Sequence, residues 1–210
     1  MRIISGKFGG RRFEVPENGM RPTKEQVREA VFSSLTARVA GARVLDLFAG
    51  AGGYGLEALS RGAVHVTAVE KAPAHWRILQ QNFETVTGEN GRAGSMNPPR
   101  TPHRGVPAAG NGRQECLPHT NSGNWRTVQS DVFDFLKDGG TFDLIFADPP
   151  YDDADLPQLA AAVEQVIAPD GLLVFEMRSS DPYSLPDKWT LNKKKKYGES
   201  RVLFLEKDNT

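Results

Sequence analysis

The stretch that decides the fold is RVLDLFAGAGGYGLEAL, residues 43–59. Its apolar first part, 43–48, has the length and composition of a buried strand, whereas Leu56, Ala58 and Leu59 recur at the spacing of one helical face. A glycine-rich turn separates the two parts and lets the backbone approach a ligand closely at the helix N-terminus. The stretch therefore predicts a strand, a ligand-binding turn and a helix, in that order.

Three glycines of this turn, Gly50, Gly52 and Gly55, fit the spacing G-x-G-x-x-G. The next apolar run, AVHVTAVE, ends in Glu70, where a carboxylate can accept both hydroxyls of a ribose. This combination fits a dinucleotide site or an S-adenosylmethionine site, because both ligands place an adenosine at the carboxyl ends of strands. A glycine-rich turn without a ligand is the remaining interpretation.

Apolar runs and helical patterns alternate along most of the chain. Further strands are predicted at residues 63–70, 125–131, 141–148, 171–177, 188–197 and 200–207. Helices are predicted through Ile78 and Phe83, from about Val132 and from about Asp155. Such alternation is typical of parallel βαβ units covered on both faces. We expect an α/β fold with a doubly wound, mostly parallel, seven-stranded, Rossmann-like sheet, closed by a hairpin at one edge.

The first 40 residues are predicted to extend this domain, which spans residues 41–207. Alternating residues around a Gly-Gly pair in 1–16 predict a short β-ribbon. A helix capped by Thr23 is expected to follow. One face of this helix comprises Val27, Ala30, Val31, Ser34 and Leu35.

Residues 88–124 interrupt the pattern. They contain seven Gly, five Pro and five Asn, too polar a composition to offset the entropy of ordering, and are expected to form a mobile loop. Cys116, His119 and His103 could suggest zinc, but a structural zinc site needs four ligands in a fixed frame. We therefore expect no metal site.

Composition excludes several classes of protein. The 210 residues fit one domain with additions, and 39% hydrophobic with 25% charged residues is ordinary for a globular protein. No run of about 18 apolar residues predicts a membrane span. A single cysteine fits a reducing compartment, and the first residues lack the apolar core of a signal peptide. We expect a cytoplasmic protein.

Charge is balanced overall but unevenly distributed. With 26 basic and 26 acidic residues, a globally basic surface for nucleic acid is excluded. Residues 1–30 carry seven basic and four acidic groups, and 188–207 carry seven and two, whereas 125–187 carry three and thirteen. Two basic ends form one patch for a polyanion if the fold brings them together, although solvated surface is the alternative for the run 193–196.

The tetrapeptide Asp148-Pro149-Pro150-Tyr151 follows a predicted strand directly. A carboxylate and a rigidly held backbone carbonyl can accept the two N–H bonds of an exocyclic amino group and aim its lone pair at a methyl donor. Two prolines fix that carbonyl and supply no competing N–H, and an aromatic ring offers a stacking face. The tetrapeptide thus favours amino-group methylation, with S-adenosylmethionine as the ligand of the glycine-rich turn.

Asp131 lies one residue beyond the predicted strand WRTVQS. Its carboxylate can contact an adenine amino group while the amide of Val132 meets a ring nitrogen. An acid that stabilises a helix N-terminus is the competing interpretation.

The order of MRIISGKFGGRRFEVP, RPTKEQVREAVFSSL, VLDLFAGAGGYGLEALSRGA, VEK and FADPPY resembles the bacterial small-subunit ribosomal RNA guanine-N2 methyltransferases of the RsmD type. The similarity covers residues 1–87 and 125–207, and the long segment 88–124 departs from the family. The resemblance implies a class I methyltransferase fold, S-adenosylmethionine as donor and a guanine of 16S rRNA, naked or in the assembling small subunit, as acceptor. We expect a monomer.

The resemblance also implies roles for individual residues. Catalysis is assigned to Asp148, Pro149, Pro150 and Tyr151. Cofactor binding is assigned to Asp46, Phe48, Ala49, Gly50, Gly52, Gly55, Glu70, Lys71, Asp131 and Val132. The RNA-facing candidates are Lys7, Arg11, Arg12, Arg21, Thr23 and Arg28.

Three other functions stay open at this point. A DNA methyltransferase acting on adenine N6 or cytosine N4 uses the same tetrapeptide, but no separate target-recognition domain is apparent. A nicotinamide-dependent oxidoreductase leaves the tetrapeptide unexplained. A non-catalytic RNA-binding assembly factor would not need the full set of catalytic residue types.

Overall fold

The computed structural model describes residues 1–16, 25–88, 120–122, 124–150 and 155–208. The helical elements are α1 (Glu25–Leu35), η1 (Thr36–Arg38), α2 (Gly53–Ser60), α3 (Pro73–Thr87), α4 (Val132–Leu136) and α5 (Leu156–Val163). The strands are β1 (Arg43–Leu47), β2 (His65–Glu70), β3 (Thr120–Ser122), β4 (Trp125–Gln129), β5 (Phe142–Ala147), β6 (Ile167–Arg178), β7 (Trp189–Tyr197) and β8 (Ser200–Lys207).

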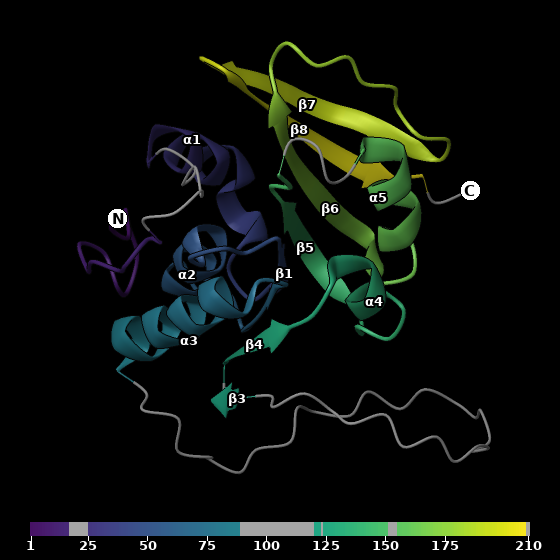
Figure 1. The fold of residues 1–210 in the computed structure, drawn as a ribbon. Helices are drawn as coiled ribbons and strands as arrows, with labels where there is room; N and C mark the ends of the chain where they lie inside the picture. Colours follow the sequence, from purple (N-terminus) through teal and green to yellow (C-terminus); the bar gives the residue numbers. More distant parts are fainter. Residues whose placement is uncertain (17–24, 89–119, 123, 151–154, 209–210) are drawn as a thin grey trace, which may run out of the picture.

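The described strands form one mixed sheet in the order β3-β4-β2-β1-β5-β6-β8-β7 (Figure 1). Strands β4, β2, β1, β5 and β6 are parallel, and β8 runs antiparallel between β6 and β7. The predicted doubly wound fold with a closing hairpin is confirmed. The seven expected strands are present, and the three-residue β3 adds an eighth inside the segment expected to be a loop.

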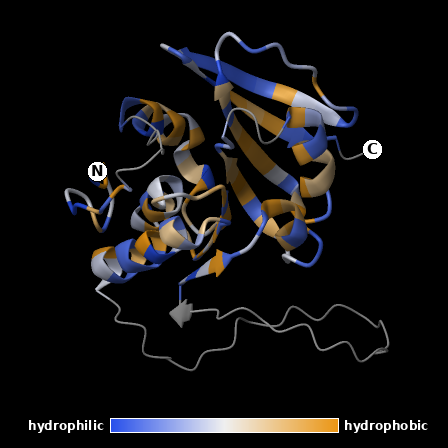
Figure 2. Ribbon diagram, viewed as in Figure 1, coloured by the Kyte–Doolittle hydropathy of each residue, from blue (hydrophilic) through white to orange (hydrophobic). Residues whose placement is uncertain are grey.

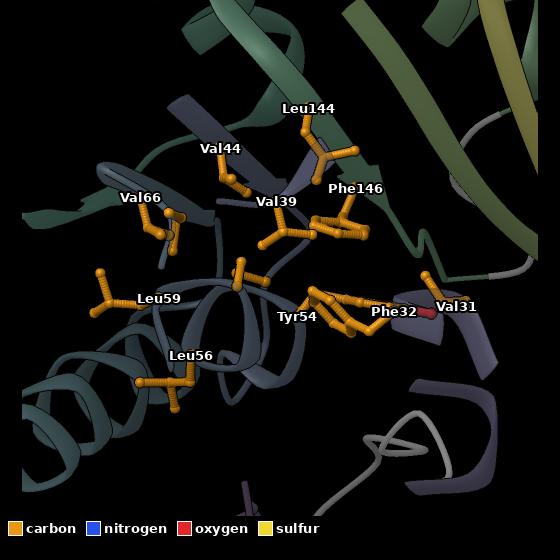
Figure 3. Close-up of a cluster of buried hydrophobic side chains, with 14 of the residues drawn as sticks. Val31, Phe32, Val39, Val44, Tyr54, Leu56, Leu59, Val66, Leu144 and Phe146 are labelled. Carbon is orange, nitrogen blue, oxygen red and sulfur yellow. The ribbon is translucent and has the colours of Figure 1, made fainter. Parts of the chain in front are cut away.

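Different helices cover the two faces of the sheet, whose central strands are largely hydrophobic (Figure 2). Apolar residues of α1, α2 and α3 pack on one face, called here the α1–α3 face, with Val44, Leu144 and Phe146 of the sheet. Figure 3 shows part of this cluster. Residues of α4 and α5 pack on the other face, called the α4–α5 face, with Leu45 and Ile145. Because successive side chains of a strand point to opposite faces of the sheet, each central strand contributes residues to both cores.

Residues 1–16 pack on α2 and α3. They fold back on themselves, with one isolated bridge, Arg2 to Arg12, rather than a regular pair of strands, so the predicted ribbon is not confirmed. Ile3, Phe8 and Phe13 are buried in the same core as α1, and Gly6 has a φ of 87°. A Cβ at Gly6 would lie 2.0 Å from the carbonyl oxygen of Ser60, so the contact with α2 requires glycine.

The strand order reverses between β1 and β5, from which the chain proceeds outward in opposite directions. In open α/β sheets, ligands bind beside the carboxyl ends of the strands at such a switch point. The glycine-rich turn follows β1 and the tetrapeptide follows β5, so the fold brings both predicted motifs to this place. No helix among the described residues is long and apolar enough to cross a membrane.

Candidate active site

The glycine-rich turn connects β1 to α2 with several residues in the left-handed region. Phe48, Gly50 and Gly52 have φ values of 56°, 54° and 86°. Glycine adopts this conformation freely, whereas a side chain costs about 1–2 kcal/mol there, so Phe48 stores strain at the site. A Cβ at Gly52 would lie 2.8 Å from Cδ1 of Leu79 and 2.9 Å from Cε2 of Phe83. Packing on α3 therefore fixes the path of the turn.

Asp46 organises the turn from the buried side. Its Oδ2 accepts a 2.8 Å hydrogen bond from the amide of Gly55, and its side chain is buried. Burial raises the pKa of this carboxyl to about 8, although the Gly55 amide acts in the opposite direction. A Cβ at Gly55 would lie 3.1 Å from that oxygen, which is closer than ordinary van der Waals contact. The first acid and the third glycine of the motif hold each other in place.

Glu70, at the end of β2, closes the turn from its other side. Its Oε2 accepts from the amide of Gly50 at 3.0 Å, and its Oε1 accepts from the amide of Ala72 at 2.8 Å. The Nδ1 atom of His75 is 3.9 Å from Oε1. Each carboxylate oxygen has lone-pair capacity for one more donor, which suits a pair of neighbouring hydroxyls.

Asp131 caps α4 and also faces Lys71. Its Oδ1 accepts from the amide of Phe133 at 2.9 Å, and Oδ2 is 3.1 Å from Nζ of Lys71. Burial alone would raise the pKa of Asp131, but the hydrogen bonds from Lys71 and Phe133 outweigh it, so the pKa lies below its usual range. Capping and ligand contact are compatible, because the carboxylate is one-third exposed and Val132 beside it is buried.

Asp148, Pro149 and Pro150 follow β5 without a turn or helix. Leu47 is in register with both Val69 and Ala147, and Ala147 with Phe175. One residue further along each strand, Glu70, Phe48, Asp148 and Glu176 occupy one row, called here the catalytic row, at the carboxyl ends of β2, β1, β5 and β6. Asp148 is half-buried in this row. Tyr151 lies outside the described residues.

Two buried residues of the site were not predicted from the sequence: Glu176 of the catalytic row and Tyr54, which contacts it. The ring of Tyr54 stacks on Phe146, with centroids 4.7 Å apart and an interplanar angle of 10°. Burial, followed by the nearby charges of Glu176 and Asp148, raises the pKa of the Tyr54 phenol well above its usual range. The signal that could have found Glu176 is an acid inside the apolar run GLLVFEM.

Three of the predicted RNA contacts in the N-terminal segment have exposed side chains that could reach a nucleic acid. Lys7, Arg11 and Arg12 are all exposed. Arg11 also donates to the carbonyl of Val86 and lies over the ring of Phe8, which attaches it to the end of α3. Two further candidates, Arg21 and Thr23, lie outside the described residues.

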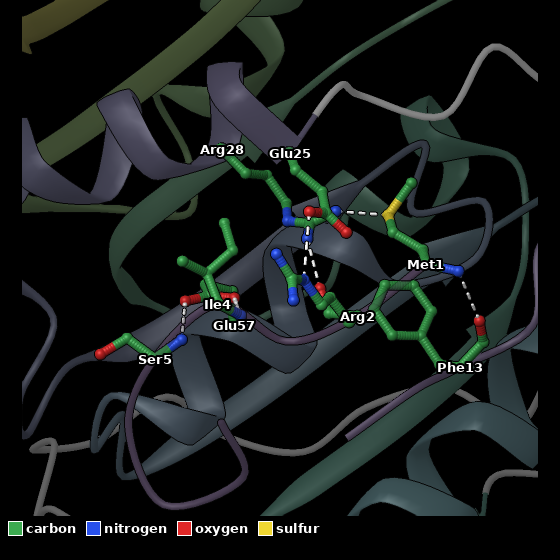
Figure 4. Close-up of polar contacts among 8 residues, drawn as sticks. All are labelled: Met1, Arg2, Ile4, Ser5, Phe13, Glu25, Arg28 and Glu57. Atoms are coloured by element: carbon green, nitrogen blue, oxygen red, sulfur yellow. Dashed lines mark hydrogen bonds and ion pairs between the residues drawn. The ribbon is translucent and has the colours of Figure 1, made fainter. Parts of the chain in front are cut away.

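The prediction that Arg28 faces RNA is wrong. Its side chain is fully buried, and it donates to the carbonyl of Arg2 at 2.6 Å and to the sulfur of Met1 (Figure 4). Burial lowers the pKa of its guanidinium, and the carboxylates of Glu57 and Glu25 oppose that shift. Arg28 faces inward because it lies on the side of α1 that packs against residues 1–16. The helical pattern in the sequence does not show this tertiary contact.

The N-terminal segment is joined to the glycine-rich turn through α3. The side-chain amide of Asn82 donates to the carbonyls of Glu14 and Ala51, at 2.9 Å and 3.0 Å, and its oxygen accepts from the amide of Glu14 at 2.9 Å. Because Asn82 is buried and Ala51 belongs to the turn, residues 1–16 brace one side of the candidate site.

Within the part of the chain that the structure describes, no group of three or more His, Cys, Asp or Glu side chains could hold a metal ion. Cys116, His119 and His103 lie outside it. Residues 1–16 contact α2 and α3, whereas residues 193–196 lie on β7 at the far edge of the sheet, so these two described basic segments are apart (Figure 1).

The strand order, the glycine-rich turn after β1, the acid after β2 and the Asp-Pro-Pro sequence after β5 define a Rossmann-like methyltransferase of class I. A family model described as conserved hypothetical protein 95 matches residues 1–98 and 114–206. The chain belongs to this family. Ribosomal RNA small subunit methyltransferase D of Escherichia coli (strain K12) is 30% identical over 204 residues, covering 95% of this chain and 86% of that relative.

Solved structures agree with this assignment. The Escherichia coli protein yhhF has a TM-score of 0.76 and 28% identity, with 100% of this chain and 99% of that chain covered. The protein SMU.776, solved in complex with SAH, has a TM-score of 0.60 and 17% identity, with 86% and 48% covered. The second likeness is one of fold alone.

Proposed function

We propose that this protein transfers a methyl group from S-adenosylmethionine to the exocyclic N2 amino group of a guanine in small-subunit rRNA. The observation that carries the proposal is the catalytic row, in which Asp148 follows β5 on the same sheet edge as Glu70 and the glycine-rich turn. The name of the Escherichia coli relative supports the choice of small-subunit rRNA as substrate. The choice of the guanine N2 atom comes from the sequence resemblance.

The residues present fit S-adenosylmethionine. Glu70 would accept both ribose hydroxyls with the lone pairs that the Gly50 and Ala72 amides leave, and Asp131 would accept from the adenine amino group. The turn at Gly50 allows close approach of the methionine part. When bound, the donor supplies an electrophilic methyl group.

Asp148 would orient the acceptor. Its carboxylate and a carbonyl of the Pro149-Pro150 pair accept the two N–H bonds of the guanine amino group, which turns the nitrogen lone pair towards the methyl group. Asp148 would also take the proton that leaves the methylated nitrogen. We propose that Tyr151 stacks on the target base, which must leave its own stack to reach the site.

We propose that the protein acts as a monomer. An rRNA substrate supports action in the cytoplasm. We propose that Lys7, Arg11, Arg12, Arg21 and Thr23 flank the path of the RNA.

The deciding experiment incubates the protein with labelled S-adenosylmethionine and, side by side, unmethylated small ribosomal subunits, stripped rRNA and duplex DNA. Nucleoside analysis should recover label as N2-methylguanosine from one or both rRNA samples. Methyladenine or methylcytosine from the DNA would refute rRNA as the substrate but would support methylation of an exocyclic amino group. No transfer to any of the three would overturn the proposal.

A further inference from the structure

Four consecutive lysines, Lys193 to Lys196, form a stretch of β7 called here the lysine strip. Among the strands that the structure describes, β7 is an edge strand and pairs with β8 alone. Lys193, Lys194 and Lys196 are exposed and Lys195 is half-buried. Among the described residues no carboxylate forms an ion pair with any of them. The strip therefore presents concentrated positive charge that neighbouring side chains leave unneutralised.

Strand register places the lysine strip level with the catalytic row. Glu176, in that row, is in register with Val202 of β8, and Val202 is in register with Lys195 of β7. Three strand spacings of about 4.8 Å separate Asp148 from Lys195, or roughly 14–15 Å along the row. An RNA backbone that delivers a base to Asp148 passes within a few nucleotides of such a position.

The four lysines do not all face the same way. Lys193 and Lys195 are in register with Phe204 and Val202, which belong to the core of the α1–α3 face. Lys194 is in register with Leu203, which belongs to the core of the α4–α5 face. Alternation along a strand places Lys196 on that second face too.

The three acids of the catalytic row, Glu70, Asp148 and Glu176, lie on the α1–α3 face. Phe146, two residues before Asp148, and Ala68, two residues before Glu70, are buried in that core. Lys193 and Lys195 therefore lie on the face of the sheet where the acceptor base must arrive, and Lys194 and Lys196 lie on the opposite one.

We propose that Lys193 and Lys195 bind the phosphate backbone of the rRNA next to the target guanine. This inference rests on the proposed function and adds a second RNA contact, at the sheet edge away from residues 1–16. Phosphate contacts position a nucleic acid without reading its sequence, and lysine is well suited to them as a mobile point charge.

A general role in protecting the sheet edge is the competing explanation. Lysines on edge strands discourage pairing with other chains. That role depends on charge along the edge, so it makes no distinction between the two faces. Phosphate binding next to the catalytic row does distinguish the two faces, because only Lys193 and Lys195 lie on the face where the RNA is expected to bind.

The test compares two double variants with equal loss of charge: Lys193→Gln with Lys195→Gln, and Lys194→Gln with Lys196→Gln. The dissociation constant for unmethylated small subunits is measured for each between about 50 and 200 mM salt. For the first variant the slope of log affinity against log salt should fall by about 1.4–2, as expected for two lost phosphate contacts. The second variant should retain the wild-type slope.

Further measurements separate the possible failures. Thermal melting and light scattering report folding and aggregation for both variants. Equal slopes in the two variants, or aggregation as the sole change, would overturn the inference and favour edge protection. A wild-type protein that binds small subunits but transfers no methyl group to their rRNA would overturn the proposed function instead.

Discussion

The phenol hydroxyl of Tyr54 donates a 2.9 Å hydrogen bond to Oε2 of Glu176, and both side chains are buried. Tyr54 belongs to α2, which follows the glycine-rich turn, and Glu176 lies on β6, beside strand β5, which Asp148 follows. The bond therefore ties the wall of the cofactor site to the neighbour of the catalytic strand. Burial raises the pKa of the Glu176 carboxyl, and hydrogen bonds from Ser200 and Tyr54 oppose the shift.

Removing the hydroxyl with Tyr54→Phe should lower the free energy of unfolding by about 1–3 kcal/mol, because a buried carboxyl loses a donor. Urea unfolding measures this loss. Tyr197→Phe is the matched control, since Tyr197 is only partly buried against the same core. An equal effect in both variants would refute the role of the bond. Combining Tyr54→Phe with Glu176→Leu should cost less than the sum of the single changes.

Asp148→Ala should reduce the rate of methyl transfer by about a hundredfold or more, because the amino group loses its orienting acceptor. The affinity for S-adenosylmethionine, measured by calorimetry, should stay close to that of the wild type. Asp138→Ala, which removes an exposed carboxyl in the connection between α4 and β5, is the control. Loss of cofactor binding in the Asp148 variant would contradict its assignment to the acceptor.

Asp46 should make stability fall with rising pH. Its pKa of about 8 in the folded chain exceeds the ordinary 3.8, so the folded state holds a proton that the unfolded state releases between these values. The stabilising contribution is complete below about pH 4 and is lost as pH rises through 8. Asp46→Asn should remove this part of the pH dependence in chemical unfolding measured from pH 5 to about 9. Parallel curves for the two proteins would show that the carboxyl is ionised in the folded state.

Substitutions of Arg28 and Arg12 should have different effects: the first on the free energy of unfolding, and the second on the binding of RNA. Arg28→Ala removes a fully buried side chain and should lower the free energy of unfolding by about 2 kcal/mol or more. Arg12→Gln should leave stability near that of the wild type and reduce the salt slope of small-subunit binding by about 1. The reverse pattern, with a reduced slope for Arg28→Ala alone, would return Arg28 to the RNA interface.

Local patterns were sufficient for much of the fold and part of the site. The order of strands and helices from Arg43 to Lys207 follows from apolar periodicity, and both motifs lie at strand ends as predicted. Strand β6 begins at Ile167, four residues earlier than predicted, because Ile167 pairs with Phe142 across a register shift. Strand β3 was missed because three polar residues pair with β4 without any apolar signal.

The sequence by itself determined the class of fold, the glycine-rich turn, the acid at Glu70 and the Asp-Pro-Pro sequence, because these depend on neighbours along the chain. Only the tertiary structure decided which side chains are buried and which residues of neighbouring strands are in register. Three features each join residues at least 19 positions apart: the burial of Arg28 against Arg2, the hydrogen bond between Tyr54 and Glu176, and the alignment of Lys195 with Glu176 of the catalytic row. Such contacts arise from packing and strand register, which no local pattern specifies.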